Sequence, residues 1–159
     1  MTTQNTKVLP KGITQADFNQ AISEFRTLLG NDNVLTEEAQ LKPYNKIMMP
    51  VEDAAHAPSA AVTATTVEQV QGVVAICNKY KIPVWTISTG RNFGYGSAAP
   101  HHRGQIILDL QKMNKILHVD ADLGTALVEP GVTYQQLYDY LEDNNIPLML
   151  SFSAPSAIA

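Results

Sequence analysis

Apolar positions recur at helical spacing in three parts of the chain. The first pattern begins after Thr14, which is a good helix N-cap, and ends at Gly30. The second runs from Thr66 to Tyr80, and the third begins after Thr133. The apolar stripe predicted for the second helix comprises Val67, Val70, Val73, Val74 and Cys77. All three segments are predicted to be helices that pack against a core.

Short apolar runs rich in β-branched residues predict strands between and after these helices. The predicted strands are 60–66, 83–88, 104–113, two strands within 115–131 joined by a turn at 120–124, and 146–153. The strand–helix–strand unit over 60–88 is a candidate right-handed crossover with two parallel strands. Residues 31–58 hold several prolines and no clean period, so this segment is predicted to be irregular.

Composition narrows the class of protein. The 159 residues are 45% hydrophobic and 16% charged, which is typical of a globular domain. A net charge of −4 without a local Lys/Arg cluster disfavours nucleic acid as a partner. The single cysteine, Cys77, excludes an internal disulfide and is predicted to be a buried, inert thiol. No apolar run approaches the roughly 20 residues of a membrane span, and no secretory signal is visible, so the cytoplasm is the default location.

A glycine-rich segment follows the strand predicted at 83–88. Gly90 to Gly96 contains three glycines together with Arg91, Asn92 and Tyr95. A Rossmann fingerprint would need a helix to open on this loop and a G-x-G-x-x-G spacing. Here the spacing is G-x-x-x-G-x-G, and the segment runs through Pro100 into another strand. The pattern therefore disfavours a Rossmann site.

Two interpretations of the loop remain on pattern alone. It could be a nest, in which consecutive backbone N–H groups converge on a phosphate with Arg91 as an added cation, or it could be a structural turn. A second segment, Glu129 to Val132, places Pro-Gly between a strand and a capped helix, where backbone can touch a ligand. That segment taken alone also suits an ordinary strand–helix turn. Together the two segments favour ligand binding.

The amino-acid sequences of these segments resemble those of a known family. The stretches "TISTGRNFGYGSAAP", "RGQIILDLQKMNKI", "ALVEPGVTY" and "LMLSFSAPSAIA" resemble the FAD-binding domain of the vanillyl-alcohol oxidase and para-cresol methylhydroxylase family. The resemblance implies an α+β fold with α/β-like character: the N-terminal half of a two-subdomain FAD-binding domain, not a Rossmann fold. We expect an N-terminal arm and helix over 1–58. Residues 59–159 would be the first part of the FAD-binding domain, truncated at its C-terminus.

The resemblance also implies site residues. The loop around the FAD pyrophosphate would comprise Ser88, Thr89, Gly90, Arg91, Asn92, Phe93, Gly94 and Gly96, and the segment along the cofactor would comprise Pro130, Gly131 and Val132. Tyr95 matches a tyrosine that helps to hold the substrate as a phenolate. Ser156 matches a position near the flavin where alcohol oxidases of the family carry an acidic residue, so serine indicates the dehydrogenase branch. No metal site is predicted.

The implied activity is oxidation of a 4-alkylphenol of the 4-cresol type by hydride transfer to FAD and water addition to a quinone methide. Electrons would pass to a c-type cytochrome subunit, and the intact flavoprotein would be a homodimer. The cytochrome partner would place the protein in the periplasm rather than in the cytoplasm. The tyrosine that attaches FAD covalently has no match in this chain. The alternatives are a related eugenol hydroxylase or vanillyl-alcohol-type oxidase, and a nucleotide-binding fragment without catalysis.

Overall fold

The predicted first helix is present in the structure, a computed structural model that describes residues 8–45, 47, 50–91 and 98–151. Helix α1 spans Gln15–Leu29, and the Thr14 hydroxyl accepts a hydrogen bond from the Asp17 amide at 3.1 Å. Gly30 ends the helix with a φ of +85°, in the region that favours glycine. The face turned to the core carries Phe18, Ala21, Ile22, Phe25 and Leu29.

Helix α3, Val67–Tyr80, begins at its predicted cap, Thr66, but its predicted apolar stripe is partly wrong. Val73 and Cys77 are buried, whereas Val67 is 56% exposed and Val74 41% exposed. Successive helical residues are rotated by about 100°. Val74 is therefore turned away from the narrow stripe through Val73 and Cys77, which packs against α1 and the sheet.

A four-stranded sheet forms the centre of the larger lobe, in the order β1-β2-β4-β3. The strands are β1 (Val34–Leu35), β2 (Ala60–Thr63), β3 (Val84–Ile87) and β4 (Ile106–Asp109). β4 runs parallel to both β2 and β3, and β1 is antiparallel to β2. The predicted strand–helix–strand unit is thus present with parallel strands, but β4 lies between them.

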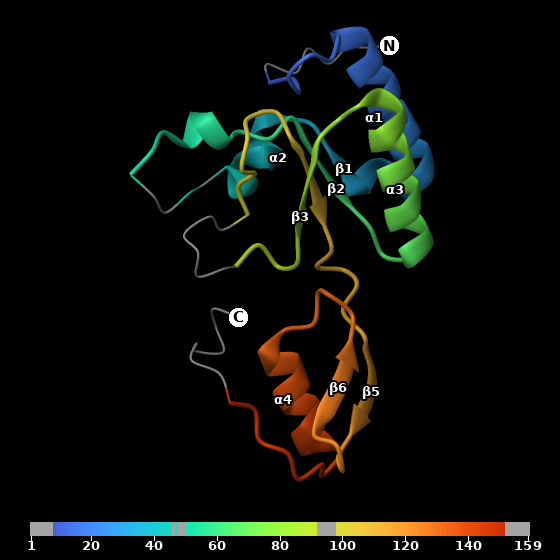
Figure 1. Cartoon of the computed structure of the whole chain (residues 1–159), viewed down its shortest axis with the longest axis vertical. Coiled ribbons are helices and arrows are strands. Elements are labelled where there is room, and N and C mark those ends of the chain that lie inside the picture. The colour runs from blue at the N-terminus through green and yellow to red at the C-terminus, as the bar shows by residue number, and fades with distance from the viewer. Residues whose placement is uncertain (1–7, 46, 48–49, 92–97, 152–159) are drawn as a thin grey trace.

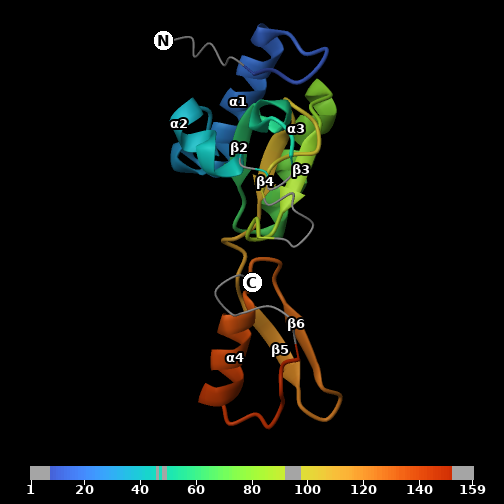
Figure 2. The same cartoon turned by 90° about the vertical axis from the view of Figure 1, so that its left-hand side faces the viewer.

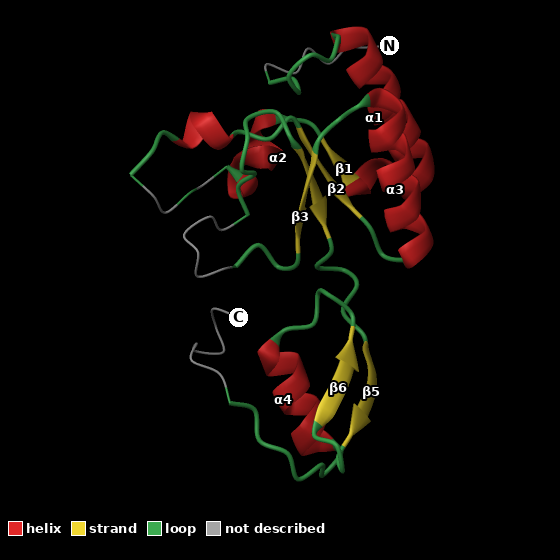
Figure 3. Cartoon of the chain, viewed as in Figure 1, coloured by secondary structure: helices red, strands yellow, loops and turns green. Residues whose placement is uncertain are grey.

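The two faces of this sheet have different covers. Helices α1 and α3 lie side by side on one face, and α2 (Glu38–Leu41) lies on the other (Figures 1 and 3). Side chains of a strand alternate between faces, so Ile106 and Leu108 join the helix-covered core while Ile107 joins the opposite cluster. We call the part of the chain from α1 to β4 the sheet lobe.

The remaining elements form a smaller hairpin lobe, made of β5, β6 and α4 (Figure 2). β5 (Ile116–Asp120) pairs antiparallel with β6 (Thr125–Val128), and α4 spans Tyr134–Asp143. The predicted turn between the strands is confirmed, and the Asp120 carboxylate accepts from the Leu123 amide at 2.9 Å. The predicted cap of α4 is confirmed as well, with Thr133 in a capping box.

Two sequence predictions of secondary structure are wrong. The segment 31–58 is not wholly irregular, because it contains β1, α2 and three short 3₁₀ turns: Asn31–Asn33, Lys42–Tyr44 and Asp53–His56. The strand predicted at 146–153 is absent from its described part, 146–151. Pro147 has no amide to donate to a neighbouring strand, and the Leu148 amide donates locally to the Ile146 carbonyl at 2.8 Å.

Across the described ranges, no helix combines the length and the apolar character that crossing a membrane requires.

Candidate functional site

Two segments predicted to bind a ligand meet just beyond the carboxyl end of β3. Ser88 follows the carboxyl end of β3, and Pro130 follows the end of β6. The Ser88 hydroxyl donates a hydrogen bond to the Pro130 carbonyl oxygen. Carboxyl ends of parallel strands are a common location of ligand sites in α/β sheets. The structure therefore brings together the start of the glycine loop and the Pro-Gly turn, which lie 42 residues apart in the sequence.

Gly131 sits where no larger residue fits. Its amide donates to the Met113 carbonyl at 2.7 Å. A Cβ atom on Gly131 would lie 2.5 Å from the Gln111 carbonyl oxygen and 2.6 Å from that of Leu110. Both neighbours are backbone, so the clash could be relieved only by moving a turn. Gly131 is buried, Pro130 is exposed and Val132 is half-buried, so this segment has one side against the protein and another at the surface.

The first part of the glycine loop has a glycine-dependent shape and lies at the surface. Gly90 has a φ of +71°, and a Cβ atom there would lie 2.8 Å from that of Ala98. Ser88 and Arg91 are exposed, while Thr89 and Gly90 are half-buried. A backbone turn next to an exposed arginine can approach an anion closely.

The residues that follow the glycine loop are held by the segment before β2. Ala98, Ala99 and Pro100 are buried, and the Pro100 carbonyl oxygen lies 2.9 Å from Nδ1 of His56. The Arg103 guanidinium donates to the carbonyl of Ala54, in the same 3₁₀ turn as His56. The predicted site residues Asn92, Phe93, Gly94, Tyr95, Gly96 and Ser156 lie outside the described residues.

Sequence reasoning missed the polar group beneath the site. Asp109 is the last residue of β4 and is only 2% exposed, and its carboxylate accepts from the Tyr44 hydroxyl at 2.7 Å. Burial, together with the hydrogen bond to Asp109 and its negative charge, raises the pKa of Tyr44 well above its usual range, so the hydroxyl remains a donor. An acidic residue directly after the apolar run Ile106–Leu108 is the signal that could have found this group.

The chain belongs to the FAD binding domain family, whose sequence profile matches residues 58–158. The fold expected from the sequence, a mixed α+β FAD-binding domain of the vanillyl-alcohol oxidase type without a Rossmann site, is confirmed. The predicted cofactor, FAD, is confirmed by the same match.

The chain is also similar to individual proteins with known names or structures. The chain is 74% identical over 159 residues to the flavoprotein subunit of 4-cresol dehydrogenase (hydroxylating) from Pseudomonas putida, covering 100% of this chain and 30% of the relative. A crystal structure of p-cresol methylhydroxylase with substrate bound is 75% identical with a TM-score of 0.92, covering 96% of this chain and 30% of that one. A 4-ethylphenol oxidase from Gulosibacter chungangensis, in complex with isoeugenol, is 37% identical with a TM-score of 0.85, covering 89% and 27%. The chain thus spans less than a third of the length of these relatives.

The described site residues fit FAD. Its pyrophosphate is an anion, and the site offers an exposed arginine beside a turn that glycine shapes. Gly131 lets the second segment pack closely on the turn beneath it, and the Ser88–Pro130 hydrogen bond holds the two segments together. One cofactor can therefore contact both.

Proposed function

We propose that this chain forms the first part of the FAD-binding domain of a flavoprotein that oxidises 4-alkylphenols of the 4-cresol type. The observation that carries the proposal is the 74% identity over all 159 residues to the flavoprotein subunit of a 4-cresol dehydrogenase. Because the chain spans 30% of that relative, the activity belongs to the longer protein of which a chain like this is one part.

The residues of this chain bind and orient the cofactor. The loop Ser88–Gly96 holds the pyrophosphate through its backbone N–H groups, with the Arg91 guanidinium as a further donor. Pro130, Gly131 and Val132 lie along the cofactor, and the hydrogen bond from Ser88 to Pro130 keeps the two segments in register. Bound FAD supplies the two-electron oxidation, as a hydride acceptor. Its covalent attachment is made by a tyrosine in another part of the protein.

Tyr95 and Ser156 act on the substrate side. Tyr95 helps to hold the phenol as its anion, which pushes electron density toward the para carbon. Loss of hydride from the benzylic carbon of the phenolate gives a neutral quinone methide, and addition of water gives a 4-hydroxybenzyl alcohol. A second oxidation gives the aldehyde. The electrons leave through a c-type cytochrome subunit bound to a flavoprotein homodimer. By the family resemblance, Ser156 would stand near the flavin, at the position where alcohol oxidases carry an acidic residue.

The test uses the whole flavoprotein with its cytochrome. We expect a yellow protein that reduces the cytochrome when 4-cresol is added. Tyr95→Phe should lower kcat/KM for 4-cresol by about tenfold or more without changing flavin content, because one hydrogen bond to the phenolate is lost. Tyr138→Phe, an exposed tyrosine of α4, is the matched control and should leave both values unchanged. A colourless protein, or a yellow one that does not oxidise 4-cresol, would overturn the proposal.

A second candidate is an oxidase, or a hydroxylase of larger phenols such as eugenol. It is favoured by the 37% identity to a 4-ethylphenol oxidase. Turnover of 4-cresol, eugenol and vanillyl alcohol should be compared, with oxygen consumption measured in the absence of the cytochrome. Preference for eugenol or vanillyl alcohol, or rapid oxygen use, selects this candidate. Flavin binding without turnover of any of the three selects a binding-only role.

A further inference from the structure

The Asp109 carboxylate joins three parts of the chain. It lies at the end of β4, accepts from the Tyr44 hydroxyl at 2.7 Å, and accepts from Gln111 twice. The Gln111 amide donates to Oδ1 at 2.9 Å, and the Gln111 side-chain nitrogen Nε2 donates to Oδ2 at 2.8 Å. The two partner residues supply three donor groups, which is what a buried carboxylate needs. An acid that merely closes its own turn would explain the Gln111 contacts but not a tyrosine 65 residues away.

The Pro-Gly segment packs against the turn that Asp109 holds. The Met113 amide donates to the Leu110 carbonyl at 2.9 Å, which closes the turn after β4. Gly131 packs against the carbonyls of Leu110 and Gln111, at distances that exclude a Cβ atom, and donates its amide to Met113. A shift of this turn would therefore be passed directly to Gly131 and to Pro130 beside it.

Tyr44 also supports the glycine loop. Its ring packs against a buried cluster that comprises Leu41, Ala61, Ile87, Ala98 and Ile107. Ile87 immediately precedes Ser88, and Ala98 is the second residue after Gly96. Tyr44 thus packs against the cluster that contains Ile87 and Ala98, which flank the loop in the sequence, while its hydroxyl holds Asp109 and the turn under Gly131.

We propose that Tyr44 and Asp109 are positioning residues that set the spacing between the two FAD-binding segments, Ser88–Arg91 and Pro130–Val132. They act through the Leu110–Met113 turn and the cluster around Ile87, and they are distinct from the residues that contact the cofactor. This inference rests on the proposed assignment of those two segments to FAD.

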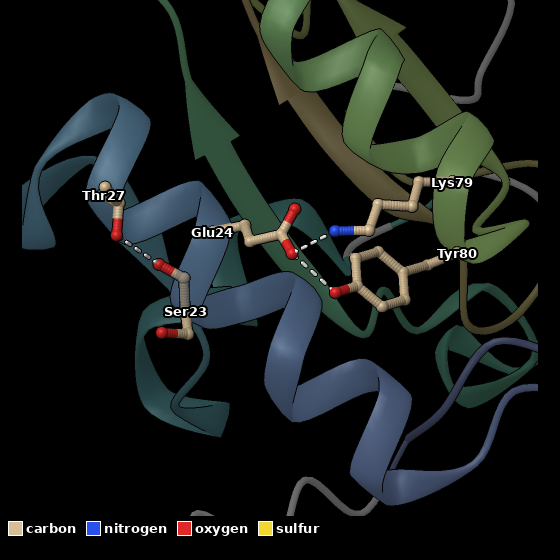
Figure 4. Close-up of polar contacts among 5 residues, drawn as sticks. All are labelled: Ser23, Glu24, Thr27, Lys79 and Tyr80. Atoms are coloured by element: carbon tan, nitrogen blue, oxygen red, sulfur yellow. Dashed lines mark hydrogen bonds and ion pairs between the residues drawn. The ribbon is translucent and has the colours of Figure 1, made fainter.

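The test compares two tyrosines that make the same kind of bond. In Tyr44→Phe the hydrogen bond to Asp109 is lost. Tyr80→Phe is the matched control. It removes the 2.6 Å hydrogen bond from the Tyr80 hydroxyl to the Glu24 carboxylate, which joins α3 to α1 (Figure 4). That carboxylate keeps Lys79 at 2.6 Å, and its pKa lies below the usual value because Lys79 and Tyr80 both donate to it. The control contact joins two helices on the face of the sheet opposite α2.

The affinity of the initial, reversible binding of FAD, before its covalent attachment, should be measured by fluorescence quenching on the whole flavoprotein prepared without flavin, with thermal unfolding recorded for each variant. We expect Tyr44→Phe to weaken FAD binding by about tenfold, the size of one lost hydrogen bond to a charged group, and Tyr80→Phe to leave it unchanged. If both variants lose thermal stability while FAD affinity is unchanged in both, the Tyr44–Asp109 pair is structural only and the proposal is wrong.

A double-mutant cycle adds a second readout. If Tyr44 and Asp109 act as one unit, Tyr44→Phe combined with Asp109→Asn should weaken FAD binding no more than the worse single variant. Additive losses would contradict a joint role. If Asp109→Asn does not fold, the FAD affinity of Tyr44→Phe alone decides whether the proposal holds. Failure of the unsubstituted flavoprotein to bind FAD would instead overturn the proposed function, so the two failures are distinguishable.

Discussion

Strands β4 and β6 are both four residues long and mostly apolar, yet they lie in opposite environments. All four residues of β4 are buried and all four of β6 are exposed. β4 pairs with β2 and β3 and has packed side chains on both faces, whereas within the described residues β6 is paired in a two-stranded sheet with β5. An apolar, β-branched run therefore determines that a strand forms, while the number of its neighbours determines whether that strand is buried.

The same contrast extends to the two lobes. The sheet lobe holds a continuous core in which Phe18, Phe25 and Ile106 are each 0% exposed. In the hairpin lobe Leu127 is 61% exposed and Leu123 75% exposed. A two-stranded hairpin is marginal by itself in water. We therefore expect the stability of this chain to come mainly from the sheet lobe.

The largest effect is expected from removing a core side chain of the sheet lobe. Phe25→Ala should lower the free energy of unfolding of this chain by about 3–5 kcal/mol, because it leaves a cavity between α1 and the sheet. Leu127→Ala on β6 should change it by no more than about 0.5 kcal/mol, because that side chain is already in water. Urea unfolding followed by circular dichroism measures both. Equal losses would show that the two lobes share one core.

An intermediate effect is expected at the joint between the lobes. Gly131→Ala should cost about 1–3 kcal/mol, because the new methyl group would be pressed against the carbonyls of Leu110 and Gln111. Gly124→Ala is the control: its Cβ would meet nothing within 4 Å, and its cost of about 1 kcal/mol would come from a φ of +62° alone.

Gly131→Ala and Gly124→Ala should differ more in FAD binding than in stability. In the whole flavoprotein, Gly131→Ala should weaken FAD binding by about tenfold or more, since the Pro130–Val132 segment must move. Gly124→Ala, in the turn of the hairpin, should leave FAD binding unchanged. If the two variants bind FAD equally well, Gly131 is needed for packing alone.

Local signals predicted most elements of the fold. The caps at Thr14, Thr66 and Thr133 each start a helix, because a side-chain oxygen that accepts from the first turn is a short-range interaction. The insertion of β4 between β2 and β3 was not predictable in this way, since strand order depends on contacts between distant segments. Val67 and Val74 follow helical spacing and are still exposed, because periodicity does not reveal how wide the covering surface is.

The site was predicted less completely than the fold. The glycine loop and the Pro-Gly turn could be recognised because close backbone approach requires glycine, and the hydrogen bond from Ser88 to Pro130 joins them. The roles of the individual residues stay predictions. Tyr44 could not be recognised from sequence, because it lies in a segment without a period and meets Asp109 only after folding.

A further effect, of about 1 kcal/mol between pH 8 and pH 10, is expected from the thiol buried in the sheet lobe. Cys77 is 4% exposed, and burial raises its pKa from 9.0 to about 12. Between these values the unfolded chain releases a proton that the folded chain keeps. The free energy of unfolding is therefore unaffected below about pH 9 and falls as the pH rises toward 12, by up to about 1.4 kcal/mol per pH unit.

Comparison with Cys77→Ala isolates this contribution, because Lys79 and Tyr80, whose pKa values are also raised by the bonds to Glu24, are present in both proteins. The stability difference between wild type and Cys77→Ala should shrink by about 1 kcal/mol from pH 8 to pH 10.

Placing the thiol on the other lobe, as Leu127→Cys in the Cys77→Ala background, should abolish this effect and give rapid alkylation by iodoacetamide, since an exposed thiol ionises freely. Equal alkylation rates for the two positions would mean that the sheet lobe opens as readily as the hairpin lobe, and the contrast between β4 and β6 would then not describe the protein in solution.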